Sequence, residues 1–453
     1  MVKNYQISDK AQNSLQSIAD YADQQSSKSF NLNLKTLPQS WAMTLSPQPV
    51  KLRLPLMVSL LPLNGAYASD VVVQYCDGKQ MHLDLMAVIE ADQASSKGAC
   101  RDVQYLWMDP MMRDDSEARA IEERWRKKNK GRKASERAEE DPAVMIRHVP
   151  ITISNATLLR RLKNAKGKTL YSFSEELDTV LKTNRAGAWS QKTDCYRYAF
   201  DRGLWGQDFN SDQSESGLVP VAYNWTVCGT MGAIRRFFKS ENVENGLAGR
   251  TLPSETGDQA FEKMPKYKPF PEGTKEVVEE DVAYLRSLSG FIDTPRLRKA
   301  IDRWSEEKRL EALADDSVEM DIFRRRAGVI GFRSGVIHHL LTRNTAESNA
   351  SVNFAILIAE YCLYQQLRLW GPQLRAALDE NIQPAYYESG NTRLFDQLED
   401  MFTLADLGKL KGDGTNESTL RTIVFRWKKA GWIICIERGK YKKVKPSNPL
   451  QSF

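Results

Sequence analysis

The segment from Ala91 to Gly98 combines small residues with a lysine in a pattern that could bind phosphate. It reads Ala-Asp-Gln-Ala-Ser-Ser-Lys-Gly and lies between a β-rich run and an amphipathic helical run. Small residues let backbone N–H groups curl around phosphate oxygens, and a lysine at a helix start supplies positive charge. We therefore expect a phosphate-binding loop made of Gln93, Ala94, Ser95, Ser96, Lys97 and Gly98.

This segment departs from the usual phosphate-loop pattern GxxxxGK[ST] at three positions. Ala91 and Ser96 replace glycines, and Gly98 replaces the hydroxyl residue that would meet Mg²⁺. The alternative interpretation is an ordinary turn between a strand and a helix. By itself the segment does not distinguish the two.

A second group of chemical interest is acidic. Glu175 and Glu176, with Asp178 close by, follow the apolar run 169–174, which is typical of a buried strand. ATP hydrolysis needs one carboxylate to hold Mg²⁺ and another to orient the attacking water. Adjacent acids at the end of a strand could do both, with Glu175 on the metal side. Favourable acids in the first turn of a helix are the alternative.

Two further positions complete the set. Thr230 follows the apolar run 222–228, and a polar residue at the end of a strand could sense a bound nucleotide. Arg250 follows the glycine-punctuated turn 242–249, and an arginine there could reach a neighbouring subunit as an arginine finger. An ordinary surface arginine is the alternative for Arg250.

In this order the four elements resemble a P-loop ATPase family of uncharacterised function. The family is common on mobile elements and plasmids of gut bacteria, often joined to or beside a primase-like domain. The resemblance covers roughly residues 50–255, through QASSKG, YSFSEELDTV, VCGT and ENGLAGR. No primase-like region is visible in this chain.

The resemblance implies a RecA-like core related to replicative helicases, with ATP and Mg²⁺ as cofactors. Lys97 would then be the phosphate-loop lysine, Glu175 and Glu176 the Walker-B acids, Thr230 the sensor and Arg250 the finger. A finger that acts on a neighbour implies a homo-oligomer, usually a ring. Ser174-Glu175-Glu176 stands in place of an Asp-Glu pair.

The tail from Met401 to Phe453 predicts a winged-helix domain. Runs 401–410 and 416–430 fit two helices, and runs 432–436 and 441–444 fit two strands joined by a turn. Eleven basic residues face four acidic ones, a local net charge of +7. A basic helix for the major groove and a basic wing for phosphates would contact DNA, through Arg421, Arg426, Lys428, Lys429, Arg438 and Lys440. A winged helix that docks protein is the alternative.

The elements that must position these residues predict an α/β fold. We expect a RecA-like P-loop NTPase core, then a helical region, then the winged helix. The expected boundaries are a helical or linker segment 1–50, a core 51–255 with a charged helical insertion 113–141, a helical domain 276–400 and a winged-helix domain 401–453.

Composition agrees with a globular, cytoplasmic chain. The formal net charge of the 453 residues is only +6, so binding of nucleic acid must depend on local clusters of charge. The start of the chain is polar, and the apolar run 52–63 is too short to cross a bilayer, so we expect buried core there and no membrane partner. The six cysteines form no CxxC pair, which favours reduced, mostly buried thiols.

These observations predict an ATP-dependent, DNA-handling motor of helicase or replication-initiator type on a mobile genetic element. Two alternatives remain open at this point. One is a nucleotide-binding DNA-binding factor without catalysis, and the other is a structural adaptor that loads a primase or relaxase. A primase or another replication protein of the element is the expected partner besides DNA.

Overall fold

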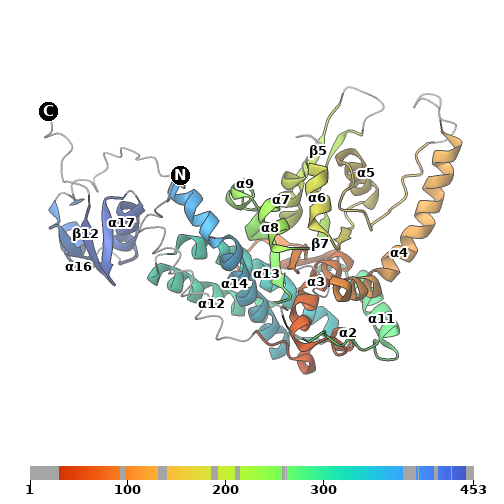
Figure 1. Ribbon diagram of the computed structural model, residues 1–453, viewed down its shortest axis with the longest axis horizontal. Coiled ribbons are helices and arrows are strands. Elements are labelled where there is room, and N and C mark those ends of the chain that lie inside the picture. The colour runs from red at the N-terminus through yellow and green to blue at the C-terminus, as the bar shows by residue number, and fades with distance from the viewer. Residues whose placement is uncertain are drawn as a thin grey trace. The chain divides into compact units, whose positions relative to one another are not determined.

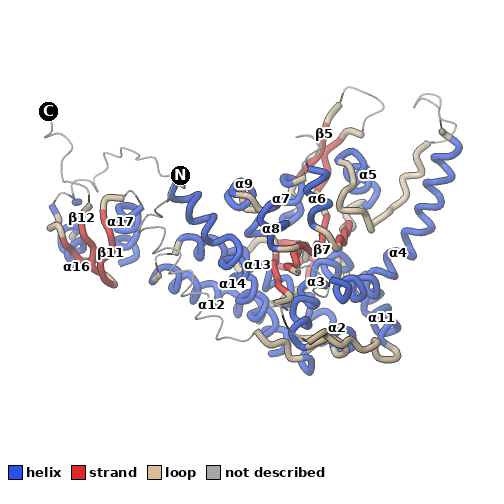
Figure 2. The backbone as a smooth tube through the Cα atoms, viewed as in Figure 1, coloured by secondary structure: helices blue, strands red, loops and turns tan. Residues whose placement is uncertain are grey.

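Four apolar runs pair side by side in a parallel sheet (Figures 1 and 2). They are β3 (Met86–Glu90), β4 (Leu170–Ser174), β7 (Tyr223–Gly229) and β8 (Leu252–Glu255), in the order β4-β7-β3-β8. All three pairings are parallel, and all of β7 is buried. β7 is covered on both faces, and its buried polar residues Asn224 and Thr226 donate hydrogen bonds to the carbonyls of Pro62 and Ser59. A parallel bridge between His148 and Tyr171 lies beyond β4.

The computed structural model describes residues 30–91, 97–130, 140–184, 192–209, 215–257, 261, 263–315, 317–380, 394–395, 397–412, 417–429 and 431–444. Residues 1–29 of the expected N-terminal segment lie outside this set, as do 92–96 and 131–139. The chain divides into two compact units between Pro372 and Gln373. Residues 276–372 therefore belong to the same unit as the sheet.

Helices connect the four parallel strands. Between β3 and β4 lie α4 (Lys97–Lys128) and α5 (Asn155–Ala165). Between β4 and β7 lie α6 (Leu177–Asn184), α7 (Thr193–Asp201) and a hairpin of β5 (Leu204–Gln207) and β6 (Gly217–Pro220). Between β7 and β8 lie α8 (Met231–Phe237), α9 (Ser240–Glu244) and α10 (Leu247–Arg250). Parallel neighbours require such crossover connections.

The charged block at 113–128 is part of α4, which runs unbroken from Lys97. Figure 1 shows α4 as a long helix that extends away from the sheet. Its outer half is tied down by buried Glu122, which forms ion pairs with Arg160 at 2.9 Å and with Arg161 at 2.6 Å. The expected solvated helix is therefore a continuation of the helix that follows the candidate loop, and α5 anchors it.

The apolar run at 52–63 forms most of α3 (Arg53–Tyr67), which is buried on all sides. This confirms the expected buried core. α3 follows η1 (Leu34–Thr36), α2 (Gln39–Leu45) and η2 (Val50–Leu52). Strand residues hydrogen-bond to its backbone: Thr226 Oγ1 donates to the Ser59 carbonyl at 2.9 Å. Gly65 permits close packing, since a Cβ there would lie 2.1 Å from the Leu83 carbonyl oxygen.

Helices of the second half of the unit pack against this core. They are α11 (Thr274–Ser287), α12 (Pro295–Ala314), α13 (Val318–Thr342) and α14 (Asn349–Glu380). A small sheet joins β2 (Gln80–Met81), β1 (Val71–Gln74) and β9 (Gly290–Phe291), and thus links the first and second halves. α13 and α14 cross closely at Gly331, where a Cβ would lie 2.6 Å from Ala359 Cβ.

Buried charges join the halves as well. Asp84 lies just before β3, and its carboxylate pairs with Arg202 at 2.6 Å. Arg333 of α13, which is fully buried, donates to the Asp84 carbonyl at 2.5 Å and stacks on Phe200. Burial lowers the pKa of Arg333 to about 10. Because buried charges need partners, this network fixes α13 against the start of β3.

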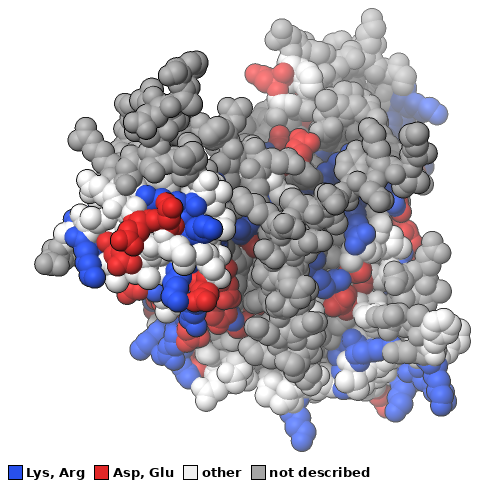
Figure 3. Space-filling model, turned by 60° about the vertical axis from the view of Figure 1, so that its left-hand side comes forward, with Lys and Arg blue, Asp and Glu red and all other residues white. Residues whose placement is uncertain are grey.

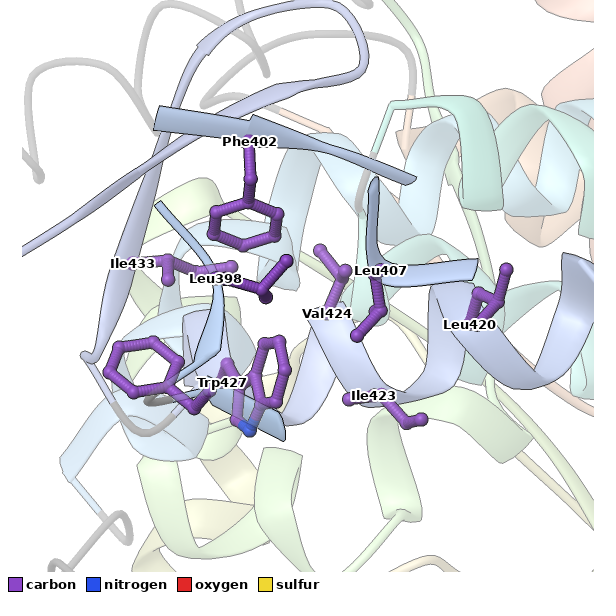
Figure 4. Packing of buried hydrophobic residues seen from close by; sticks show 9 residues of the cluster. Leu398, Phe402, Leu407, Leu420, Ile423, Val424, Trp427 and Ile433 are labelled. Carbon is purple, nitrogen blue, oxygen red and sulfur yellow. The ribbon is translucent and has the colours of Figure 1, made fainter. Parts of the chain in front are cut away.

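The C-terminal unit contains β10 (Met401–Thr403), α16 (Leu404–Lys411), α17 (Glu417–Lys429), β11 (Ile433–Glu437) and β12 (Lys440–Lys443). Its antiparallel sheet has the order β10-β12-β11. Figure 4 shows its core, in which Trp427 and Val424 of α17 face Phe402 and Ile433 of the sheet. The two helices and the hairpin expected from the sequence are present.

One detail of the tail was wrong. Met401 to Thr403 was expected to be helical, but it forms β10, which pairs antiparallel with β12. The helix begins later because Thr403 and Asp406 form a capping box. The pairing with a distant strand outweighs a local pattern that suits either structure.

Two other expectations concern burial and the membrane. Cys100, Cys195, Cys228 and Cys362 are buried free thiols, as expected. Within the part of the chain that the structure describes, no helix is both long and apolar enough to cross a bilayer.

We predict that Gly65→Ala lowers the free energy of unfolding by about 1–3 kcal/mol, because the new methyl group must displace backbone at Leu83. Gly232→Ala is the matched control, since Gly232 is also helical and its nearest neighbour, Arg236 Nη1 at 3.4 Å, ends a flexible side chain. Urea unfolding of the three proteins measures the difference. Equal stability of the two variants would contradict the close packing of α3.

Candidate functional site

The carboxyl ends of β3, β4 and β7 meet at one edge of the parallel sheet. Lys97 begins α4 after β3, Glu175 and Glu176 follow β4, and Thr230 follows β7. Neighbouring parallel strands bring their carboxyl ends together, and ligands in open α/β sheets bind outside that edge. Three of the four expected elements therefore share one location.

Lys97 and Glu176 are in direct contact. Lys97 Nζ lies 3.2 Å from Glu176 Oε1, and their side chains are 15% and 55% exposed. Beside them, Arg101 of α4 lies 3.7 Å from a Glu175 carboxylate oxygen. A lysine at a helix start can bind phosphate, and the paired carboxylates beside it can bind a divalent cation.

Gln93, Ala94, Ser95 and Ser96 lie outside the described residues, and Gly98 is in the first turn of α4.

Thr230 has a structural partner in this state. Its Oγ1 accepts a hydrogen bond from the Ala233 N–H at 3.3 Å and thereby caps α8. The backbone next to it is fixed, because Ala91 N–H donates to the Gly229 carbonyl at 2.9 Å. The residue before the candidate loop is thus joined to the end of β7. This bond holds Ala91, which follows β3, beside Gly229, which ends β7.

Arg250 lies at the opposite edge of the sheet. It ends α10 just before β8 begins, and β8 runs parallel to β3. Its guanidinium donates to the Gly246 carbonyl at 3.1 Å and pairs with Asp201 at 3.5 Å. Burial, with the Arg326 guanidinium nearby, lowers the pKa of Arg250. Within one chain, Arg250 therefore does not join Lys97, and the finger role stays a prediction that requires a second copy.

At the carboxyl edge of the sheet, the structure adds residues that the sequence did not indicate. Arg368 of α14 hydrogen-bonds to Glu90 and lies 3.3 Å from Glu255 Oε2. Burial would lower the pKa of Arg368, but the carboxylates of Glu255 and Glu90 outweigh it and raise the pKa. Glu90 could have been noticed, since it is the acid that ends an apolar run. Nothing local marks Arg368, because more than a hundred residues separate it from its partners.

No group of three or more histidine, cysteine, aspartate or glutamate side chains gathers to hold a metal ion among the described residues. Glu175, the expected metal residue, contacts Arg101 instead. Mg²⁺ is commonly bound by one or two carboxylates together with substrate phosphates, so a preformed cluster is not required. The exposed carboxylates after β4 fit that kind of site.

The basic residues of the tail divide by environment. Arg426, Lys429, Arg438 and Lys440 are exposed, whereas Arg421 and Lys428 are half-buried. Arg421 pairs with Glu417 at 2.6 Å, and Lys440 pairs with Glu437 at 2.9 Å. Figure 3 shows one face of the molecule, on which basic and acidic side chains are interspersed. The local positive charge is therefore partly neutralised.

The outward side of α17 carries a stripe that contains two of the expected basic residues, Arg426 and Lys429, together with two hydroxyl residues that the sequence pattern did not single out, Ser418 and Thr422. Ser418, Thr422, Arg426 and Lys429 are exposed and recur at helical spacing, opposite the buried Leu420, Val424 and Trp427. Hydroxyl and basic side chains on one helix face are suited to base edges and phosphates. The sequence signal for this stripe was the apolar spacing of α17, because the residues opposite the apolar positions are the exposed ones.

No protein-family model and no curated protein matches the chain. The family resemblance drawn from the residues therefore stays a prediction.

We predict that Lys97→Ala and Glu176→Gln each change the free energy of unfolding by less than about 1 kcal/mol, because Glu176 is largely exposed and solvent screens the pair. Arg202→Ala should instead cost about 3–5 kcal/mol, because it strands the carboxylate of Asp84, which is only 2% exposed. Urea unfolding compares the three. A large loss for Lys97→Ala would mean that Lys97 is part of the structural core.

Proposed function

We propose that this protein is a P-loop-type ATPase that handles DNA. One observation carries the proposal: Lys97, at the start of the helix that follows β3, lies 3.2 Å from Glu176, which follows β4. A cation for phosphates and a pair of carboxylates for metal and water are the groups that phosphoryl transfer needs. The strand order also supports the proposal. β7 lies between β3 and β4, and Thr230 follows β7 directly.

Each residue has a role under this proposal. Lys97 and the N-terminal N–H groups of α4 would bind the phosphates of ATP. Glu175 would hold Mg²⁺, which when bound neutralises charge on the phosphates, and Glu176 would orient the attacking water. Thr230, already at the end of β7, would contact the bound nucleotide as a sensor. Arg250 would act from a neighbouring copy, in a homo-oligomeric ring.

The C-terminal unit supports the DNA part of the proposal. Its order of strand, two helices and a β-hairpin is the order expected of a winged helix, in which α17 would be the recognition helix. Arg426 and Lys429 face outward on α17, and Arg438 lies in the turn between β11 and β12. We propose that these residues bind duplex DNA, as in a helicase or replication initiator of a mobile element.

One observation favours a second candidate function, a nucleotide-binding DNA-binding factor without turnover. Gly98 follows Lys97 at the position where a hydroxyl residue would assist Mg²⁺. Both candidates require nucleotide binding at the same edge. They differ only in hydrolysis, so one set of variants separates them.

We predict that Lys97→Ala weakens binding of a fluorescent ATP analogue with Mg²⁺ by about tenfold or more, as expected for loss of a charge-assisted contact. Lys168→Ala is the matched control, because Lys168 also pairs with a carboxylate, Asp70, but lies before β4 at the other edge. Equal affinity of the two variants would exclude the phosphate-binding role.

ATP hydrolysis is measured on the wild-type protein, Lys97→Ala and Glu176→Gln. Glu176→Gln should retain binding and lower turnover by about a hundredfold or more, in line with loss of a catalytic base. If the wild-type protein binds the ATP analogue but hydrolyses ATP no faster than Lys97→Ala does, the second candidate, a nucleotide-binding factor without turnover, is supported.

We predict that neutralising Arg426 and Lys429 together to glutamine in the full-length protein flattens the salt dependence of duplex DNA binding by about two units of log affinity per log salt. Lys299→Gln with Arg303→Gln is the control, since these two residues form an exposed basic pair on α12. Fluorescence anisotropy across a salt series gives the slopes. An unchanged slope in the α17 variant would assign the C-terminal unit to protein docking.

A further inference from the structure

Two carboxylates lie side by side at the edge of the sheet where the nucleotide is proposed to bind. Glu90 and Glu255 are in register at the carboxyl ends of β3 and β8. Their side chains are 15% and 32% exposed, so water screens them only in part. Glu90 directly precedes the segment that leads to Lys97. Unpaired, two such charges would repel each other and any phosphate that approached.

Arg368 of α14 lies between these carboxylates. Its Nη2 hydrogen-bonds to Glu90 and is 3.3 Å from Glu255 Oε2. Gln365 supports this geometry: it accepts a hydrogen bond from Arg368 Nε at 2.8 Å and donates to Glu255 Oε1 at 2.8 Å. Tyr361, one turn earlier, meets Ser254 Oγ at 2.8 Å. One face of α14 therefore fits over the ends of β3 and β8.

We propose that Arg368 is a positioning residue for the nucleotide site, which neutralises Glu90 and Glu255 so that polyphosphate can approach Lys97. This inference rests on the proposed function. Arg368 need not touch the ligand; it acts through the two acids. Arg368 places one positive charge between the two carboxylates, and replacing it with a neutral residue removes that charge.

The position of α14 does not depend on Arg368 alone. Gln366 on the same helix donates to the carbonyls of Gly249 at 2.9 Å and Thr251 at 3.0 Å. Close packing at Gly331 against Ala359 holds α14 on α13. A change at Arg368 is therefore expected to alter the charge at the edge while the helix stays in place.

The test measures affinity of the full-length protein for the fluorescent ATP analogue with Mg²⁺. Arg368→Gln should weaken binding by about tenfold, since the loss of one cation near the ligand has this order of effect at intermediate dielectric. Adding Glu255→Gln to Arg368→Gln should restore most of the affinity, and Arg368→Lys should retain it. Glu255→Gln alone should tighten binding. Arg309→Gln, which breaks the exposed 2.7 Å pair with Glu306, is the control and should leave the affinity unchanged.

The salt dependence separates charge from folding. The deficit of Arg368→Gln should shrink as salt rises, because screening weakens charge repulsion, whereas a folding defect would persist and lower the melting temperature. Unchanged affinity in Arg368→Gln, or no recovery in the double variant, would overturn the inference while the proposed function stands. No binding by the wild-type protein would overturn the proposed function, and the inference with it.

Discussion

Parallel pairing of β3 with β7 on one side and β8 on the other is the constraint on which the rest of the molecule depends. Because β3 is central, both its faces and both its edges are covered, and only Glu90 at its carboxyl end is partly exposed. The same pairing brings the ends of β4 and β7 to that point. Lys97, Glu176 and Thr230 are far apart in the sequence, and the pairing of the strands brings them to the same edge.

The core beneath the sheet is built around a helix with no polar face. α3 is buried along nearly its whole length, so its carbonyls and its glycine contact strands directly. Such a helix has no stable state alone, since its apolar surface requires neighbours on every side. The α11–α14 region supplies part of that cover and adds the buried Arg333, which makes it part of the same unit as the sheet.

The edge that carries the candidate site is electrostatically balanced rather than simply basic. Lys97, Arg101 and Arg368 each face a carboxylate of another element. In such a site an incoming phosphate competes with carboxylates for cations, and binding depends on how many charges remain unpaired. Arg250 lies at the other edge, so any role in phosphate chemistry requires a second copy of the chain.

The two faces of α17 in the C-terminal unit differ in burial. The inner face of α17 packs Trp427 and Val424 against the sheet, which leaves Arg426 and Lys429 for solvent. A small unit can bury only one face of a helix this short. The apolar spacing that specifies the core thus also specifies which basic residues are displayed.

The sequence by itself predicted strands at 169–174 and 222–228, a helix after the candidate loop, and two helices with a hairpin in the tail. The two strands are rich in aromatic residues and the α17 segment is helically periodic, so the local pattern indicates the structure that forms. It did not determine that 401–403 is a strand, that 113–128 continues α4, or that Arg368 meets Glu90 and Glu255. These depend on pairing between segments far apart in the chain, for which no local pattern exists. Only the tertiary structure decides them, because the free energy of an ion pair or a strand pairing depends on which groups the fold brings together.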